Sequence, residues 1–135
     1  MAAADYRLAE ISRDSAAQIG RQLRAAGRTA RFQGHWGFQW YAEQQGMVSV
    51  DWVRHPLHAG ELHALPGTNS NLHPIREGTA TVWTAVSAEP FPWLATMGGP
   101  VGAGFYADVF GPLPFAVGPV PTEWSGVVEL LPRPQ

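Results

Sequence analysis

The chain has 135 residues, a formal net charge of −2 and neither lysine nor cysteine, so all nine of its basic residues are arginines. These absences exclude Schiff-base lysines, thiol nucleophiles, disulfides and cysteine metal sites from the sequence. Hydrophobic residues make up 45% of the chain and charged residues only 15%, against roughly a quarter charged in soluble domains. This balance favours burial of apolar surface against a partner or a second copy, or else a compact core rich in aromatic residues.

Arginine in place of lysine, together with abundant Ala, Gly and Pro, is typical of a GC-rich genome, and we expect a bacterial or phage origin. The first residues lack the basic start and apolar stretch of a secretory signal, and no run approaches the ~20 apolar residues of a membrane span. We therefore expect one cytoplasmic domain over residues 1–135, or a virion component if the source is a phage, without membrane contact.

Residues 14–27 are the clearest predicted helix. Ile19 and Leu23 belong to an apolar stripe at helical spacing, and Gly27 is a natural C-terminal stop. Residues 5–11 are compatible with an earlier helical turn. Several arginines lie off the stripe, so the helix presents either a solvated face or a basic surface for an acidic partner. The arginines concerned are Arg21, Arg24 and Arg28.

The sequence period then changes from helical to alternating, which predicts a β-hairpin over residues 36–54. Its first strand, 36–43, places aromatic residues at alternate positions. Its second strand, 47–54, alternates in the same way, and Gly46 between the two is suited to a turn.

Four polar residues are candidates for acid–base chemistry. In the predicted hairpin His35 lies near the strand that holds Asp51, so the histidine can act as a general base beside that carboxylate or beside Glu43. In a predicted strand over 105–110, Tyr106 and Asp108 share one face and form an acid–base or hydrogen-bonding pair if the strand lines a cavity. The alternative for His35 is a histidine at the strand edge exposed to water. The alternative for Tyr106 and Asp108 is the solvent-exposed face of an open sheet.

Residues 55–78 are rich in turn-forming residues and contain four of the five histidines, with a short strand expected over 60–65. Alternation along that strand places Glu61 and His63 on the same side, as metal ligands separated by one residue require. A histidine-bound zinc or other divalent ion is therefore the alternative interpretation. The leading one is solvated or core-capping histidines and no cofactor. The candidate ligands are His55, His58, Glu61, His63 and His73.

Further strands are predicted over 79–86, 105–110 and 124–131, and four prolines between the last two favour an extended strap. One helix followed by five or six strands predicts an α+β fold. In it the N-terminal helix packs on a mainly antiparallel five- to six-stranded sheet that is open or barrel-like.

No residue spacing in the chain names a reaction. The leading hypothesis is a non-catalytic protein–protein interaction or assembly protein: a small regulatory protein, an immunity-type protein or a phage structural subunit. Its partner is another protein or a second copy, and nucleic acid is not expected because the net charge is negative. The alternative is a small enzyme or ligand-binding barrel that uses His, Asp and Tyr side chains. The candidate partner-binding residues are Arg21, Arg24, Arg28, Phe91, Trp93 and Phe115.

Overall fold

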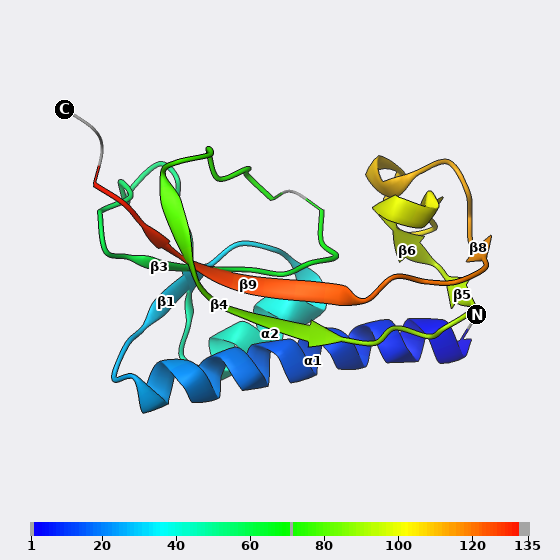
Figure 1. The fold of residues 1–135 in the computed structure, drawn as a ribbon, viewed down its shortest axis with the longest axis horizontal. Coiled ribbons are helices and arrows are strands. Elements are labelled where there is room, and N and C mark those ends of the chain that lie inside the picture. The colour runs from blue at the N-terminus through cyan, green and yellow to red at the C-terminus, as the bar shows by residue number, and fades with distance from the viewer. Residues whose placement is uncertain (1, 71, 133–135) are drawn as a thin grey trace.

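A long N-terminal helix, α1 (Ala2–Ala25), lies along one face of a mixed sheet in the computed structural model, which describes residues 2–70 and 72–132 (Figure 1). The helix begins well before residue 14, where the sequence analysis placed its start, and ends two residues before Gly27. The earlier half is helical because Ala4 and Ile11 continue the buried stripe of Ile19 and Leu23.

A second helix, α2 (Trp36–Gln44), occupies the first half of the predicted hairpin, so the prediction of a hairpin over 36–54 is wrong. Phe38 and Ala42 lie one helical turn apart and both are buried. The Phe38 ring meets the edge of Phe32, with the ring centroids 6.2 Å apart. Burial of this pair of positions stabilises a helix here, because a strand would place them on one face together with Trp36 and Trp40, which are exposed.

The main sheet is open and mixed, so the barrel-like arrangement and the mainly antiparallel pairing are both corrected. Its strands run in the order β2-β1-β3-β9-β4. The first three are parallel to one another, and β9 is antiparallel to both of its neighbours. The strands are β1 (Ala30–Phe32), β2 (Val48–Ser49), β3 (Leu62–Leu65), β4 (Ala80–Ala88) and β9 (Glu123–Leu130). The strands predicted over 60–65, 79–86 and 124–131 are confirmed as β3, β4 and β9, with small shifts at their ends.

The hydrophobic core lies between the helices and one face of this sheet. Its largest members are Phe32, Phe38 and Ile19, all buried, with Leu62 and Val127 contributed by the central strands. Alternation along β3 therefore directs Leu62 toward the helices and its neighbour His63 to the opposite face. The fold is α+β, and within the described residues no helix combines the length and apolarity needed to cross a membrane.

Residues 89–122, which we call the arm, form a separate lobe beside the N-terminal end of α1 (Figure 1). Two short antiparallel ladders organise it, β5 with β8 and β6 with β7. The strand predicted over 105–110 is wrong, because this segment bends and then forms a 3-10 turn, η2 (Asp108–Phe110). The remaining elements are β5 (Leu94–Ala95), β6 (Met97–Gly98), η1 (Gly99–Val101), β7 (Ala103–Gly104) and β8 (Ala116–Val117).

Candidate functional site

A cavity of about 240 Å³, which we call the groove, lies where α1, the start of α2, the loop after β3 and the arm meet. It is lined by residues 35–38 and 68–69, by Met97 and Tyr106 of the arm, and by four residues of α1. Those four are Asp5, Leu8, Ala9 and Ser12. The groove is mostly apolar with a few polar groups at its edge, which is the usual character of a small-ligand site.

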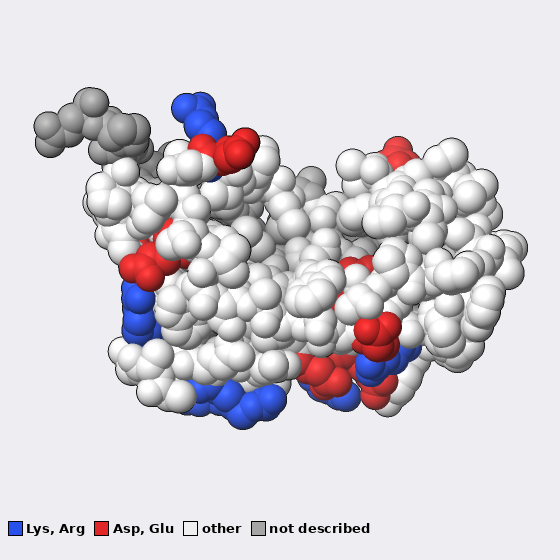
Figure 2. All heavy atoms as spheres, in the orientation of Figure 1, with Lys and Arg blue, Asp and Glu red and all other residues white. Residues whose placement is uncertain are grey.

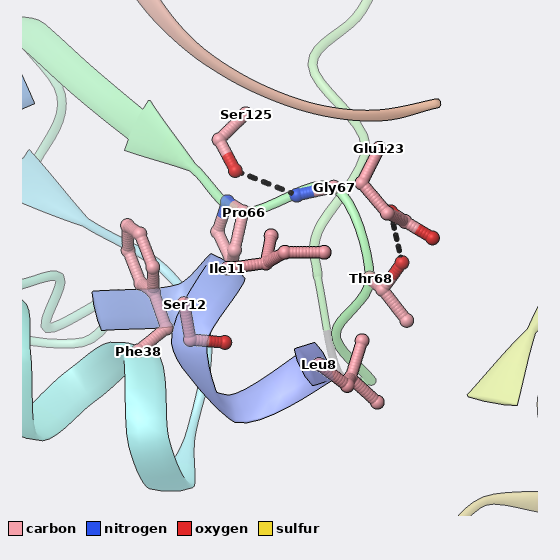
Figure 3. A pocket seen from close by; sticks show the side chains of 9 residues that line it. All are labelled: Leu8, Ile11, Ser12, Phe38, Pro66, Gly67, Thr68, Glu123 and Ser125. Carbon is pink, nitrogen blue, oxygen red and sulfur yellow. Dashed lines mark hydrogen bonds between the residues drawn. The ribbon is translucent and has the colours of Figure 1, made fainter. Parts of the chain in front are cut away.

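Beneath the groove the structure is tightly packed around the beginning of β9, as Figure 3 shows. Gly67 donates its backbone N–H to Ser125 Oγ at 3.3 Å, and Thr68 donates its hydroxyl to the Glu123 carboxylate. A Cβ at Gly67 would collide with the carbonyl oxygen of Trp124, so glycine is required where the loop crosses β9. Only about 10 Å³ of space remains among these residues, room for about one water molecule.

The backbone at the entrance of α2 is strained and firmly held. Trp36 has φ 54°, a left-handed conformation that a bulky residue adopts at a cost of about 1–3 kcal/mol. Asn69 fixes the preceding residue at both ends: the His35 N–H donates to Asn69 Oδ1, and Asn69 Nδ2 donates to the His35 carbonyl, each at 3.1 Å. Gly34, with φ 108°, provides the turn before it. These contacts hold the Trp36 side chain at the edge of the groove, where it stays 64% exposed.

Asp5 supplies the negative charge of the groove. Its Oδ1 accepts a hydrogen bond of 2.6 Å from the hydroxyl of Thr96, a buried residue of the arm. The carboxylate also lies close to Tyr106. Desolvation raises the pKa of the Tyr106 phenol, and the charge and hydrogen bonding of Asp5 raise it further. The groups of the arm that contact the Asp5 carboxylate are therefore two neutral hydroxyls, those of Thr96 and Tyr106.

Two of the four acid–base candidates share the groove, and two lie elsewhere. His35 and Tyr106 both line it. Tyr106 lies in the segment predicted as a strand over 105–110, and His35 directly precedes the predicted hairpin strand 36–43; the structure forms neither strand. Asp51 does not approach His35 through a hairpin. Instead it closes a turn by accepting the N–H groups of Val53 and Arg54, each at 3.0 Å. These bonds, that of Arg54 first, lower the pKa of Asp51. Asp108 lies in η2, outside the groove lining.

The histidine candidates are scattered, with one pair as predicted. Glu61 and His63 lie on the same side, with Oε2 and Nε2 3.7 Å apart. The same carboxylate accepts the His58 N–H at 3.2 Å and has Arg31 Nε at 4.0 Å, so its neighbours include a cation and a backbone donor as well as His63. Within residues 2–70 and 72–132, no three potential ligands converge on one point.

The other two histidines of the loop have different environments. The His73 ring packs against Trp52 with the ring centroids 4.7 Å apart and the ring planes inclined by 55°, and its backbone N–H donates to Gln33 Oε1 at 2.7 Å. His55 is exposed. His63, by contrast, is fully buried, and desolvation lowers its pKa while the nearby Glu61 opposes that shift.

The arm is rich in exposed apolar side chains: it holds eight of the seventeen large ones in the described part of the chain. Its 34 residues contain only two charged side chains, Glu89 and Asp108, and Figure 2 shows this lobe almost free of charged atoms on the face in view. The predicted partner-binding aromatics Phe91, Trp93 and Phe115 are all exposed. Five further exposed apolar side chains of the arm were not predicted as partner-binding residues: Phe105, Tyr106, Val109, Leu113 and Val117.

The predicted arginine surface lies at the opposite end of α1 from the arm and does not join it (Figure 1). Arg28 donates to the Gly60 carbonyl at 2.6 Å and to Glu129 Oε2 at 3.2 Å, so it braces its own domain. Arg24 donates to Gln45 Oε1 at 3.0 Å, and Arg21 is exposed.

Comparison with known proteins adds no relationship to this geometry. No protein-family model matches the chain, and neither a curated protein nor a solved structure matches it.

Proposed function

We propose that the protein works by protein–protein contact, as an assembly or regulatory subunit, and that the arm is its principal contact surface. The observation that carries the proposal is the concentration of eight exposed large apolar side chains in an arm of 34 residues with two charges. Exposed apolar side chains gathered in one segment favour an interaction site, because leaving them in water is unfavourable. The proposal covers regulatory, immunity-type and phage structural roles, in the cytoplasm or in a virion.

Magnitudes favour the arm over the arginine end of α1 as the main source of binding energy. Trp93 is 62% exposed, and covering it together with Phe115 removes roughly 200 Å² of apolar surface from water, worth about 5 kcal/mol. An exposed arginine–carboxylate pair contributes about 0–1 kcal/mol. Arginines such as Arg21 therefore serve orientation more than affinity.

The arm is also pre-organised around Trp93. The Trp93 carbonyl accepts the Gly118 N–H and the Pro92 carbonyl accepts the Val120 N–H, each at 3.1 Å. Prolines restrict the backbone on both sides of these bonds. Because the backbone at Trp93 is already held in place, binding of a partner there costs little conformational entropy.

The test is the molecular mass of the purified protein across concentrations, measured by sedimentation for wild type, Trp93→Ser and Trp40→Ser. Trp40 is the matched control because it is 61% exposed but lies on α2. We expect self-association that Trp93→Ser abolishes and Trp40→Ser leaves intact.

If the wild type is monomeric, a photo-crosslinking residue at position 93 is compared with one at position 40 in the producing cells. A defined product from position 93 alone supports a hetero-partner. Monomeric protein with equal crosslinking from both positions would refute the arm as a contact surface.

A further inference from the structure

We propose that the groove binds a small organic ammonium ion, held between the Asp5 carboxylate and the exposed face of Trp36. The groove shares Tyr106 with the apolar surface of the arm, but the inference is drawn from the groove itself and does not rest on the proposed function. Three observations carry it: the strained backbone of Trp36, the charge of the lining, and the size of the cavity.

Trp36 is the first observation. Its left-handed backbone is maintained by the Asn69 contacts to His35 and by Gly34, yet its indole is 64% exposed and gains little burial in return. Backbone strain that burial of the side chain does not offset is typical of a residue held in position for a ligand. An indole is also the aromatic group that attracts cations most strongly.

The charge of the lining is the second observation. Asp5 is the single acidic residue among the described residues that line the groove, and its hydrogen bond from the arm comes from the neutral hydroxyl of Thr96. No arginine lines the groove in the part of the chain that the structure describes. A carboxylate beside aromatic rings and an apolar wall of Leu8 and Met97 complements a cation with an aliphatic body and disfavours anions.

Size limits the ligand. A volume of about 240 Å³ accommodates a compact molecule such as choline or benzylammonium. Thr68 and Ser12 stand at the same cavity and provide hydroxyl groups for a polar substituent of the ligand.

The experiment titrates ¹⁵N-labelled protein with choline and with benzylammonium, each against its uncharged analogue, 3,3-dimethylbutan-1-ol and benzyl alcohol. The signal is the Trp36 indole N–H resonance, identified by its loss in Trp36→Gly. We expect saturable shifts with at least one cation and roughly tenfold or weaker binding of its uncharged analogue.

Asp5→Asn keeps the oxygen that accepts from Thr96 but removes the charge. It is expected to weaken cation binding roughly tenfold while leaving the weak binding of the uncharged analogue unchanged. The matched control is Asp14→Asn, an exposed acid of the same helix outside the groove, which should leave both titrations as in wild type.

Trp36→Gly separates binding from folding. Glycine adopts the left-handed conformation without strain, so this variant should melt at a higher temperature than wild type. It should also lose cation binding, which is followed in both proteins through the backbone N–H resonances of Thr68 and Asn69 in the groove lining. Trp40→Gly, in the interior of α2, should keep binding and melt at a lower temperature. Equal binding of cation and uncharged analogue, or no saturable shift with either cation up to tens of millimolar, would overturn the proposal.

Discussion

Thr96 and Asp5, 91 residues apart in the chain, are joined by a hydrogen bond of 2.6 Å from the threonine hydroxyl to Asp5 Oδ1. Thr96 is buried, so water does not replace this bond easily. Arg7 adds a second tie at the base of the arm, donating from Nε to the Glu89 carbonyl at 2.8 Å. The two bonds fasten the arm to the first turns of α1 and set one wall of the groove.

Replacing Thr96 by valine, which has nearly the same shape, should loosen the arm without unfolding the sheet. Loss of a buried hydrogen bond to a charged acceptor costs about 1.5–3 kcal/mol. We expect faster hydrogen exchange over residues 94–117 and unchanged protection in β9. Thr122→Val removes an exposed hydroxyl bond to Glu89 and serves as the control. Uniform acceleration across the chain would contradict a local role for Thr96.

His63 gives the fold a dependence on acid. Burial lowers its pKa from 6.5, so the folded state prefers the neutral ring, and the unfolded chain takes up a proton first as the pH falls. Stability should therefore decline as the pH drops through the ordinary histidine pKa. The charged groups that face the ring are Glu61, which opposes this effect, and Arg31, which strengthens it.

His63→Leu should flatten the decline, which denaturant unfolding between about pH 7 and pH 5 measures. The quantity compared is the slope of the free energy of unfolding against pH, because the substitution also changes packing and so shifts the free energy at every pH. His58→Leu alters an exposed histidine of the same loop and should retain the wild-type slope. A slope that His63→Leu leaves unaltered would show that other groups govern the acid response.

The strands that could be predicted from sequence were those whose alternation agrees with their burial. β3, β4 and β9 are rich in β-branched or apolar residues and bounded by turns, and they lie close to their predicted positions. The segment 36–44 was misjudged because Trp36, Phe38 and Trp40 fit a period of two. The buried residues of this segment are Phe38 and Ala42, which are four positions apart, as on one face of a helix. A short apolar run does not distinguish this helical spacing from the alternation of a strand.

The groove could be predicted only in fragments. His35 was predicted as a general base beside Asp51, and Tyr106 as the partner of Asp108 on one strand face; both line the groove, whereas neither aspartate does. Asp5 gave no signal, because its position depends on the arm folding back against α1 over 91 residues of chain. The strain at Trp36 was equally hidden, since it arises from the Asn69 contacts rather than from any local pattern.

Glu123 responds to pH in the sense opposite to His63. Burial raises its pKa above the ordinary value of 4.5, and the hydrogen bond from Thr68 opposes the shift. The folded state therefore keeps this proton to higher pH than the unfolded chain, and the stability associated with it is lost as the pH rises through that range.

Glu123→Gln should gain stability relative to wild type as the pH rises from about 4 to about 7, measured by urea unfolding at each pH. Thr68→Val, which removes the opposing bond, should steepen the wild-type decline. Glu77→Gln, in an exposed turn before β4, is the control for removing a carboxyl. A constant difference between Glu123→Gln and wild type would show that burial of the carboxyl has no energetic consequence.

Arg28 should prove to be a stabilising residue of the domain. Its guanidinium joins the turn after α1 to the Gly60 carbonyl and to Glu129 on β9, and the pair with Glu129 is about one-third exposed on each side. Because solvent screens such a pair, Arg28→Ala should lower the free energy of unfolding by only about 1 kcal/mol. Arg21→Ala, the matched exposed arginine of α1, should change it by less than about 0.5 kcal/mol. Urea unfolding of both variants measures the difference. If instead Arg28→Ala left stability intact and weakened an association that Trp93→Ser also weakens, the arginine end of α1 would belong to the contact surface after all.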